Sequence, residues 1–341
     1  MRCEHVHPES EMVKSFRLRV LDDGVMWSRC EPGRYITLNF FDAARRLRKR
    51  NYSIIGRPGP DLVEIAVKRE GNEGVSSALH ESLTPNTLVY ADGVSGDITV
   101  ERIRTSGKVL MLAGGVGVTL PLALVRHLCE LANRGETVPR VTLAVCVPRY
   151  RDLVFLTELL SIEASHSWFE LVTYITRDHV RGDAPYFRPG RPSIDELKLI
   201  GQHAGALLIC GSGEFSSSML KMAETHFPAA QILIEAFSSV SRMAGAGEDA
   251  PDAGTVRVTI GNQGVTCDAP RAVSLLETLE ENGVRIRSQC RSGICGSCRI
   301  RIVSGECRSE GDIALGAAER SEGYALACCA YPVGPELELL A

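Results

Sequence analysis

Three cysteines lie within nine residues of one another in the stretch QCRSGICGSC, near the end of this 341-residue chain. Cys290, Cys295 and Cys298 have the spacing C-x4-C-x2-C, and Cys328 follows with 29 residues between, in YALACCAYP. Clustered cysteines in a chain of this size indicate a metal or redox site more often than a disulfide scaffold. Zinc usually takes paired C-x2-C knuckles, and only one such pair is present here. The chain must therefore fold so that two separate segments meet around one centre.

The x4–x2 spacing with a distant fourth cysteine is the pattern of a [2Fe-2S] cluster held by thiolates. Glycines in the loop, such as Gly293 and Gly296, suit this pattern, because backbone N–H groups must approach the sulfur atoms closely. Cys329 adjoins Cys328, and successive side chains on an extended segment point to opposite sides. We expect Cys328 to bind iron and Cys329 to pack away from it. The predicted metal ligands are Cys290, Cys295, Cys298 and Cys328.

The segment around these cysteines has the pattern of a small mixed domain. TVRVTIGNQGVTCD, from Thr255, alternates apolar and polar residues about a Gly-rich turn, as a hairpin does. Leu276 and Leu279 then lie on one predicted helical face that ends near Gly283. From Thr255 onward the chain resembles a plant-type ferredoxin of the β-grasp fold. The resemblance implies an α+β [2Fe-2S] ferredoxin domain over residues 255–341.

Near the N-terminus, the stretches RYITLNF and LVEIAVKRE alternate strictly and predict strands of a small antiparallel barrel. RNYSI, followed by VKREGNEGVSSALH, resembles the flavin motif R-x-Y-S and the later phosphate-binding turn of the ferredoxin-NADP reductase superfamily. The resemblance implies that Arg50 holds a phosphate, Tyr52 offers an aromatic face and Ser53 reaches flavin N5. It implies a flavin-binding β-barrel domain over residues 1–104. Its flavin contacts are Arg50, Asn51, Tyr52, Ser53, Val67, Lys68, Gly74, Val75, Ser76 and Ser77.

The middle of the chain carries a second nucleotide signal. KVLMLAGGVGVTLPLALVRHL predicts a buried strand, a Gly-rich turn and a helix from about Pro121, which can seat a pyrophosphate at the helix N-terminus. The uncharged segment Val109–Val125 is short for a membrane span and interrupted by glycines, so a buried strand, turn and helix fit better. RVTLAVCVPRY and GALLICGSGEF predict two more strands that end in loops. We expect a nicotinamide-binding α/β domain with a parallel sheet over residues 105–237.

In the reductase superfamily these loops look like the GGxGxTP loop and the CGxxxF nicotinamide motif. This chain departs in having Leu120 where proline is expected, with Pro121 one place later. The resemblance places Cys210 near nicotinamide C4 and Glu235 over the flavin, although a cysteine at a strand end can also be a small buried core residue. With Ser53, these are the implied catalytic residues. The nicotinamide and closing contacts that the resemblance implies are Gly114, Gly115, Gly117, Thr119, Cys210, Gly211 and Phe237.

The chain as a whole predicts a multidomain fold in which residues 238–254, small and polar, form a linker before the ferredoxin domain. It resembles the reductase components of multicomponent oxygenases, of the phthalate dioxygenase reductase kind. This implies an NAD(P)H:ferredoxin-type oxidoreductase that passes electrons through flavin and a [2Fe-2S] cluster to a Rieske-type hydroxylase or demethylase. Two alternatives stay open: a redox-sensing iron–sulfur flavoprotein, and a reductase for a different metalloprotein acceptor.

Two cofactor choices remain open at this point. FAD is expected over FMN because ADGVSGDITV resembles the loop of FAD-binding members. NADH is expected over NADPH, since Asp152 could meet ribose hydroxyls, although Arg149 or Arg151 could meet a 2′-phosphate. The formal net charge of −4 gives no strong attraction to nucleic acid or anionic membranes, and the first residues lack the apolar core of a secretory signal. We therefore expect a cytoplasmic monomer without nucleic-acid or membrane partners.

Overall fold

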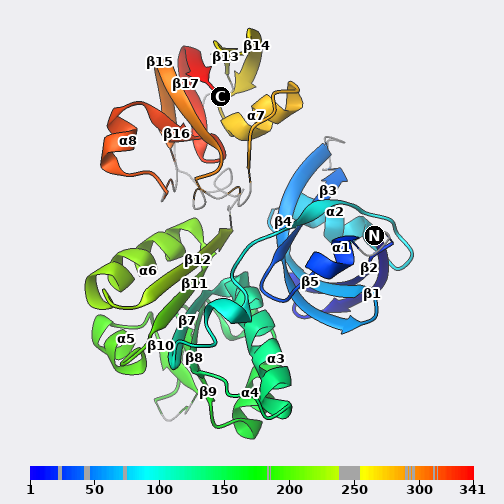
Figure 1. Cartoon of the computed structure of the whole chain (residues 1–341), viewed down its shortest axis with the longest axis vertical. Helices are drawn as coiled ribbons and strands as arrows, with labels where there is room; N and C mark the ends of the chain where they lie inside the picture. Colours follow the sequence, from blue (N-terminus) through cyan, green and yellow to red (C-terminus); the bar gives the residue numbers. More distant parts are fainter. Residues whose placement is uncertain are drawn as a thin grey trace. The chain divides into compact units, whose positions relative to one another are not determined.

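The chain folds into three β-sheets with short helices packed on them (Figure 1). It divides into two compact units, Met1–Glu235, which holds the first two sheets, and Ala236–Ala341, which holds the third. The computed structural model describes residues 1–21, 25–41, 47–71, 75–182, 184, 186–237, 254–288, 291, 293, 296–309, 312 and 314–341.

The first sheet is the predicted antiparallel barrel, with strand order β1-β2-β5-β4-β3-β6. A bridge between Arg2 and Leu88, and a main-chain hydrogen bond from Val89 to Met1, join its two edges. These contacts bring the two edges of the sheet together at the start of β1. The strands are β1 (Arg2–Pro8), β2 (Val13–Arg19), β3 (Tyr35–Phe41), β4 (Leu47–Gly59), β5 (Leu62–Lys68) and β6 (Tyr90–Ser95), with helices α1 (Val25–Arg29) and α2 (Val75–Ser82).

The barrel interior is built by the alternation seen in the sequence. Ile36 and Leu38 on β3 are fully buried, as are Val63 and Ile65 on β5. The opposite face of β5 is buried as well, since Glu64 is only 8% exposed. An outward carboxylate can be buried only where another element covers it with polar partners, and here that element is a helix of the second sheet.

The second sheet has the order β10-β9-β8-β7-β11-β12, and β7 to β11 pair in parallel. Helices α5 and α6 pack on one face, where their buried residues join the core of β7, β8, β9 and β11, and α3 and α4 lie on the other (Figure 1). The strands are β7 (Lys108–Gly114), β8 (Arg140–Val147), β9 (Phe169–Ile175), β10 (Phe187–Pro189), β11 (Ala206–Ser212) and β12 (Gln231–Phe237). The helices are η1 (Val100–Arg102), η2 (Gly115–Val118), α3 (Thr119–Asn133), η3 (Tyr150–Asp152), α4 (Leu156–Ser165), α5 (Ile194–Ile200) and α6 (Gly213–His226).

The apolar segment in the middle of the chain forms a strand, a tight turn and a helix, as predicted. The helical stretch Gly115–Asn133 is long and apolar enough to cross a membrane, but 61% of its apolar window is buried inside the protein, as in a core helix. Helix α3 begins at Thr119, two residues before the predicted start at Pro121. A 3-10 turn over the Gly-rich loop therefore leads directly into α3.

The third sheet is mixed, with the order β14-β13-β17-β15-β16. The predicted hairpin forms from β13 and β14, and the final strand β17 inserts beside β13 in parallel. Leu276 and Leu279 of α7 are buried against this sheet, and Gly283 follows the helix with a φ of 76°. The strands are β13 (Thr255–Ile260), β14 (Val265–Pro270), β15 (Arg299–Ser309), β16 (Tyr324–Leu326) and β17 (Ala330–Leu340), with helices α7 (Leu275–Glu281) and α8 (Ala317–Ser321).

Candidate functional site

The predicted flavin residues lie on β4, between β3 and β5 in the barrel wall. Asn51 is fixed by Thr37, whose hydroxyl donates to Asn51 Oδ1 at 2.9 Å. Burial raises the pKa of Tyr52, although the positive charge of Arg50 acts against this rise. Tyr52 is therefore a neutral aromatic ring at neutral pH. Ser53 is 3% exposed, so its hydroxyl needs a partner within the protein.

The turn between β5 and α2 uses the hydroxyl groups of both predicted serines. Ser76 Oγ accepts from the backbone N–H of Glu70 at 2.9 Å, and Ser77 Oγ donates to the carbonyl of Gly71 at 2.7 Å. These bonds shape the turn at the N-terminus of α2, where backbone N–H groups are available for an anion. Of the neighbouring predicted contacts, Val67 and Val75 are buried and Lys68 is exposed, while Gly74 lies outside the described residues.

The Gly-rich loop after β7 packs backbone to backbone against the end of β11. A Cβ atom at Gly117 would lie 2.2 Å from the carbonyl oxygen of Cys210, and one at Gly114 would lie 2.7 Å from the ring of Phe215. Gly115 has a φ of 57°, in the left-handed region that favours glycine. The structure thus brings the two predicted nicotinamide motifs, including Gly211, into direct contact. Thr119 is buried at the start of α3.

Cys210 is a fully buried, neutral thiol at the end of β11. Burial raises its pKa well above the ordinary value, and the negative charge of Glu235 adds to the rise. The backbone of Leu120 acts in the opposite direction and lowers this pKa. A proline at this position would have no N–H to offer. The departure from the expected GGxGxTP pattern therefore leaves a backbone N–H that influences the pKa of a predicted site residue.

Ser53 and Glu235 join the barrel to the second sheet. The hydroxyl of Ser53 on β4 donates to Glu235 Oε1 on β12 at 2.6 Å. Burial raises the pKa of Glu235 to about 7, against the lowering effect of the Ser53 hydrogen bond. Two of the three predicted catalytic residues, Ser53 and Glu235, are therefore in direct contact, and the charge of Glu235 also acts on the third, Cys210. Phe237 follows at the end of β12.

In the second unit the structure places two of the four predicted metal ligands together. The sulfur atoms of Cys298 and Cys328 are 3.3 Å apart, and both residues are buried. The backbone N–H of Gly293 donates to Cys328 Sγ at 3.3 Å, as the small residues of the loop suggested. Buried sulfur atoms that face one another and accept backbone N–H groups fit an iron–sulfur cluster. Cys290 and Cys295 lie outside the described residues.

The expected orientation of Cys329 is wrong. Residues 327–329 form a turn, closed by a hydrogen bond from Cys329 N–H to Leu326 O at 2.9 Å, and are not an extended segment. Side-chain alternation does not apply in a turn. The sulfur atoms of Cys328 and Cys329 are 3.5 Å apart, so the two thiols lie close to one another. The assignment of Cys328 as the ligand stays a prediction.

Sequence reasoning missed an ion pair that holds the cysteine loop. Arg291, with a φ of 56°, donates from Nη1 and Nη2 to the two carboxylate oxygens of Glu280 on α7, at 2.8 and 2.6 Å. Burial alone would lower the pKa of Arg291, but Glu280 raises it. A bidentate pair of this kind fixes both position and orientation. No spacing rule would have paired these two residues, which belong to different elements.

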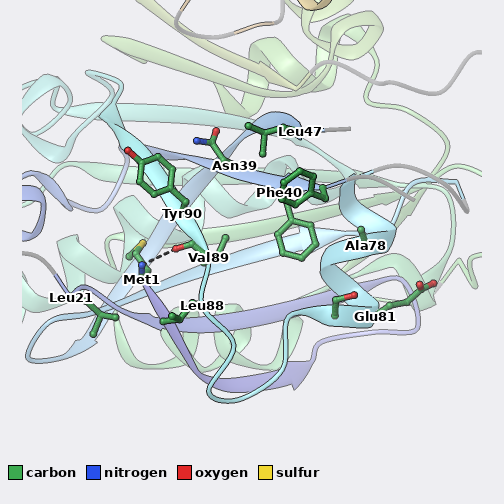
Figure 2. Close-up of a pocket in the computed structure, with 12 residues that line it drawn as sticks. Met1, Leu21, Asn39, Phe40, Leu47, Ala78, Glu81, Leu88, Val89 and Tyr90 are labelled. Atoms are coloured by element: carbon green, nitrogen blue, oxygen red, sulfur yellow. Dashed lines mark hydrogen bonds between the residues drawn. The ribbon is translucent and has the colours of Figure 1, made fainter. Parts of the chain in front are cut away.

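An apolar groove of about 970 Å³ lies on the barrel. Figure 2 shows Phe40, Leu88 and Tyr90 around it, with the amino group of Met1 donating to Val89 O at 2.8 Å. Among the described residues that line the groove, none is a predicted flavin contact. The groove is lined by Leu47 at the start of β4 but by none of the predicted flavin contacts further along that strand.

Comparisons with known proteins agree with this architecture. Residues 258–333 match the model of the 2Fe-2S iron-sulfur cluster binding domain. The phthalate 4,5-dioxygenase oxygenase reductase subunit of Pseudomonas putida is 32% identical over 261 residues, covering 75% of this chain and 72% of that protein. NADH oxidoreductase HCR of Escherichia coli is 26% identical over 336 residues, covering 98% and 95%.

The fold is that of a solved reductase over its whole length. The structure of phthalate dioxygenase reductase, described as modular for electron transfer from pyridine nucleotides to [2Fe-2S], superposes with a TM-score of 0.73 at 22% identity. The match covers 100% of this chain and 97% of that one. The order of the three sheets is therefore shared along the full length of both chains.

Proposed function

Because the chain belongs to the family of oxygenase reductase subunits that includes the phthalate 4,5-dioxygenase reductase subunit, we propose that it carries electrons from NADH through a flavin and a [2Fe-2S] cluster to a separate oxygenase. The observation that carries this proposal is the 2.6 Å hydrogen bond from Ser53 to Glu235, which joins the predicted flavin strand to the predicted nicotinamide domain. When bound, the flavin supplies the change from two-electron hydride chemistry to single electrons that a [2Fe-2S] cluster can carry.

The residues on β4 fit the demands of a flavin. Arg50 supplies a guanidinium that can bind a phosphate with charge-assisted hydrogen bonds. Tyr52 is neutral and offers its ring face. We propose that Ser53 donates its hydroxyl near flavin N5 and that Glu235, with a pKa of about 7, holds or releases a proton beside it at neutral pH. We propose FAD as the flavin, with FMN as the alternative, because ADGVSGDITV resembles the loop of FAD-binding members.

In the predicted nicotinamide site, the chain supplies a closely packed Gly-rich loop and the buried thiol of Cys210. Because Gly117 has no side chain, the backbone of the loop after β7 packs directly against the backbone of Cys210. A nicotinamide ring bound beside Cys210 would therefore be shielded from bulk water. Asp152, the last residue of the 3-10 turn η3 that follows β8, accepts from the backbone N–H of Arg149 at 3.1 Å. A carboxylate there favours ribose hydroxyls over a 2′-phosphate, which supports NADH over NADPH.

The remaining expectations stand as parts of the same proposal. We propose domains over residues 1–104, 105–237 and 255–341 with a linker over 238–254, and ligation of the cluster by Cys290, Cys295, Cys298 and Cys328. We also propose that the protein is a cytoplasmic monomer with neither nucleic-acid nor membrane partners. The oxygenase partner would be a Rieske-type hydroxylase or demethylase.

A second candidate is a reductase for a metalloprotein other than an oxygenase. The observation that favours it is the near full-length similarity to NADH oxidoreductase HCR, a protein whose name states no oxygenase. Both candidates share the electron path inside this chain and differ only in the acceptor.

The experiment that tests the electron path uses the purified holoprotein and one cysteine variant. The flavin released by the holoprotein is identified by mass, and NADH and NADPH are compared for their ability to bleach it without oxygen. Cys295→Ser should still reduce a two-electron dye but fail to reduce cytochrome c, because only the cluster step is lost. Unchanged cytochrome c reduction in this variant would contradict the proposed electron path. A purified protein that contains no flavin and does not react with NADH or NADPH would contradict the proposed function.

A further inference from the structure

Arg126 links the helix of the nicotinamide loop to the flavin strand. Helix α3 begins at Thr119, directly after the Gly-rich loop, and Arg126 lies two helical turns further on. Its Nη1 donates to the carbonyl oxygen of Ile55 on β4 at 3.1 Å and to Glu64 Oε2 on β5 at 2.8 Å. One guanidinium nitrogen therefore holds two neighbouring barrel strands at once.

The other edge of the same guanidinium is held by the second sheet. Arg126 Nε and Nη2 donate to the two carboxylate oxygens of Glu158 on α4 at 2.7 and 2.8 Å. The side chains of Arg126 and Glu64 are 25% and 10% exposed, so the contact between them is largely removed from water, whereas the side chain of Glu158 is 37% exposed. Burial alone would lower the pKa of Arg126, but Glu158 and then Glu64 raise it. The guanidinium is thus a charged, planar group whose three nitrogen atoms all donate hydrogen bonds, to the barrel on one side and to α4 on the other.

Strand β4 is attached to the nicotinamide half of the unit at two points that are two residues apart. Ser53 binds Glu235 through its side chain, and Ile55 binds Arg126 through its carbonyl. A single attachment would leave the strand free to pivot, whereas two attachments fix its direction as well as its distance. A Cβ atom at Gly56 would lie 3.2 Å from Arg126 Nη1, so the strand also makes room for the guanidinium.

The geometry points to Arg126 as a positioning residue for hydride transfer, which holds the flavin strand at a set distance from the helix that follows the nicotinamide loop. This inference rests on the proposed function. Arg126 acts through Ile55 and Glu64 and takes no part in the chemistry itself. Because hydride transfer depends steeply on the distance between the two reacting atoms, loosening this attachment should slow the step more than it weakens nicotinamide binding.

The test is anaerobic stopped-flow reduction of the flavin by NADH in the full-length holoprotein and in Arg126→Ala. The limiting rate of bleaching should fall about tenfold or more, while the NADH dissociation constant changes by less than about threefold. Flavin content and unfolding temperature are measured on the same samples. Arg134→Ala is the matched control, because Arg134 follows the same helix and pairs with Glu136 just beyond it, and it should react like the unsubstituted protein.

Arg126→Lys supplies the second variant. A lysine keeps the positive charge beside Glu64 and Glu158 but has no planar fork, so the limiting rate should lie between those of Arg126→Ala and the unsubstituted protein. A normal rate in Arg126→Ala, an equal loss in Arg134→Ala, or a rate that falls only in step with flavin content would overturn the inference. If NADH and NADPH leave the flavin of the unsubstituted protein unbleached, the proposed function fails first and the inference falls with it.

Discussion

The two redox sites of this chain are assembled over very different sequence distances. Ser53 and Glu235, which meet in the first unit, are 182 residues apart, whereas Cys298 and Cys328, which meet in the second, are 30 residues apart. In the proposed function the first site would bind its cofactors through hydrogen bonds and charges from several elements, and the second would bind its metal through covalent bonds to sulfur. The second site should therefore fail when a single atom is changed, and the first should weaken by degrees.

The largest expected effect is the loss of the cluster in Cys328→Ser. A serine oxygen is a poorer ligand than a thiolate, so the visible absorption of the [2Fe-2S] centre and the reduction of cytochrome c should both disappear. Cys329→Ser is the matched control and should keep both, although its sulfur lies 3.5 Å from that of Cys328. Loss in the Cys329 variant with retention in the Cys328 variant would place the ligand one residue later.

The second largest expected effect is a pH dependence of the free energy of unfolding of the first unit, caused by Glu235. Its pKa rises from 4.5 to about 7 in the folded protein, so the unfolded chain loses this proton first as pH increases. The free energy of unfolding should fall between pH 4.5 and 7, by at most about 3 kcal/mol, and then level off. In Glu235→Gln this part of the slope should be absent.

Urea unfolding of the flavin-free protein measures this effect. The two tryptophans, Trp27 and Trp168, both lie in the first unit, so their fluorescence follows that unit alone. Subtracting the Glu235→Gln curve from that of the unsubstituted protein removes the contribution of the other titrating groups. Identical slopes in the two proteins would show that the carboxyl titrates in its ordinary range.

A comparable but graded effect is expected for flavin binding in Arg50→Ala. Removal of a charge-assisted contact to a phosphate should weaken binding by roughly 1.5 to 3 kcal/mol, so the protein should lose much of its yellow colour on dilution. Lys49→Ala is the control on the same strand, because the Lys49 ammonium pairs with Asp92 at 2.6 Å. Full flavin retention in the Arg50 variant would make RNYSI an ordinary barrel strand.

The smallest expected effect tests whether the iron–sulfur site also depends on a non-covalent contact, the ion pair between Arg291 and Glu280. In Glu280→Ala, Arg291 loses its bidentate partner, and the cysteine loop is held less firmly to α7. Iron release to a chelator should become about fivefold faster, equivalent to about 1 kcal/mol. Glu306→Ala, an exposed carboxylate on β15, should release iron at the normal rate. Equal rates in the two variants would show that the loop is held by the cluster alone.

The sequence was informative wherever the signal was local. Alternation placed β3, β5, β13 and β14, and the glycines placed the turn before α3, because each pattern is set by neighbouring residues. The contacts of Arg126 with Ile55, Glu64 and Glu158 could not be predicted, since they join four elements and no periodicity relates them. Cys329 was misplaced for a related reason. The alternation rule assumed a strand, but a hydrogen bond closes residues 327–329 into a turn.

The leucine at position 120 has a practical consequence for spectroscopy. Its backbone N–H lowers the pKa of Cys210, a predicted nicotinamide contact, whereas a proline at this position would have no amide proton to observe. In a ¹⁵N-labelled sample this amide should give a resonance whose chemical shift follows the environment of the Cys210 sulfur. Titration with a non-reducible nicotinamide analogue would then test whether this amide responds to the bound ring, as the predicted position of Cys210 requires.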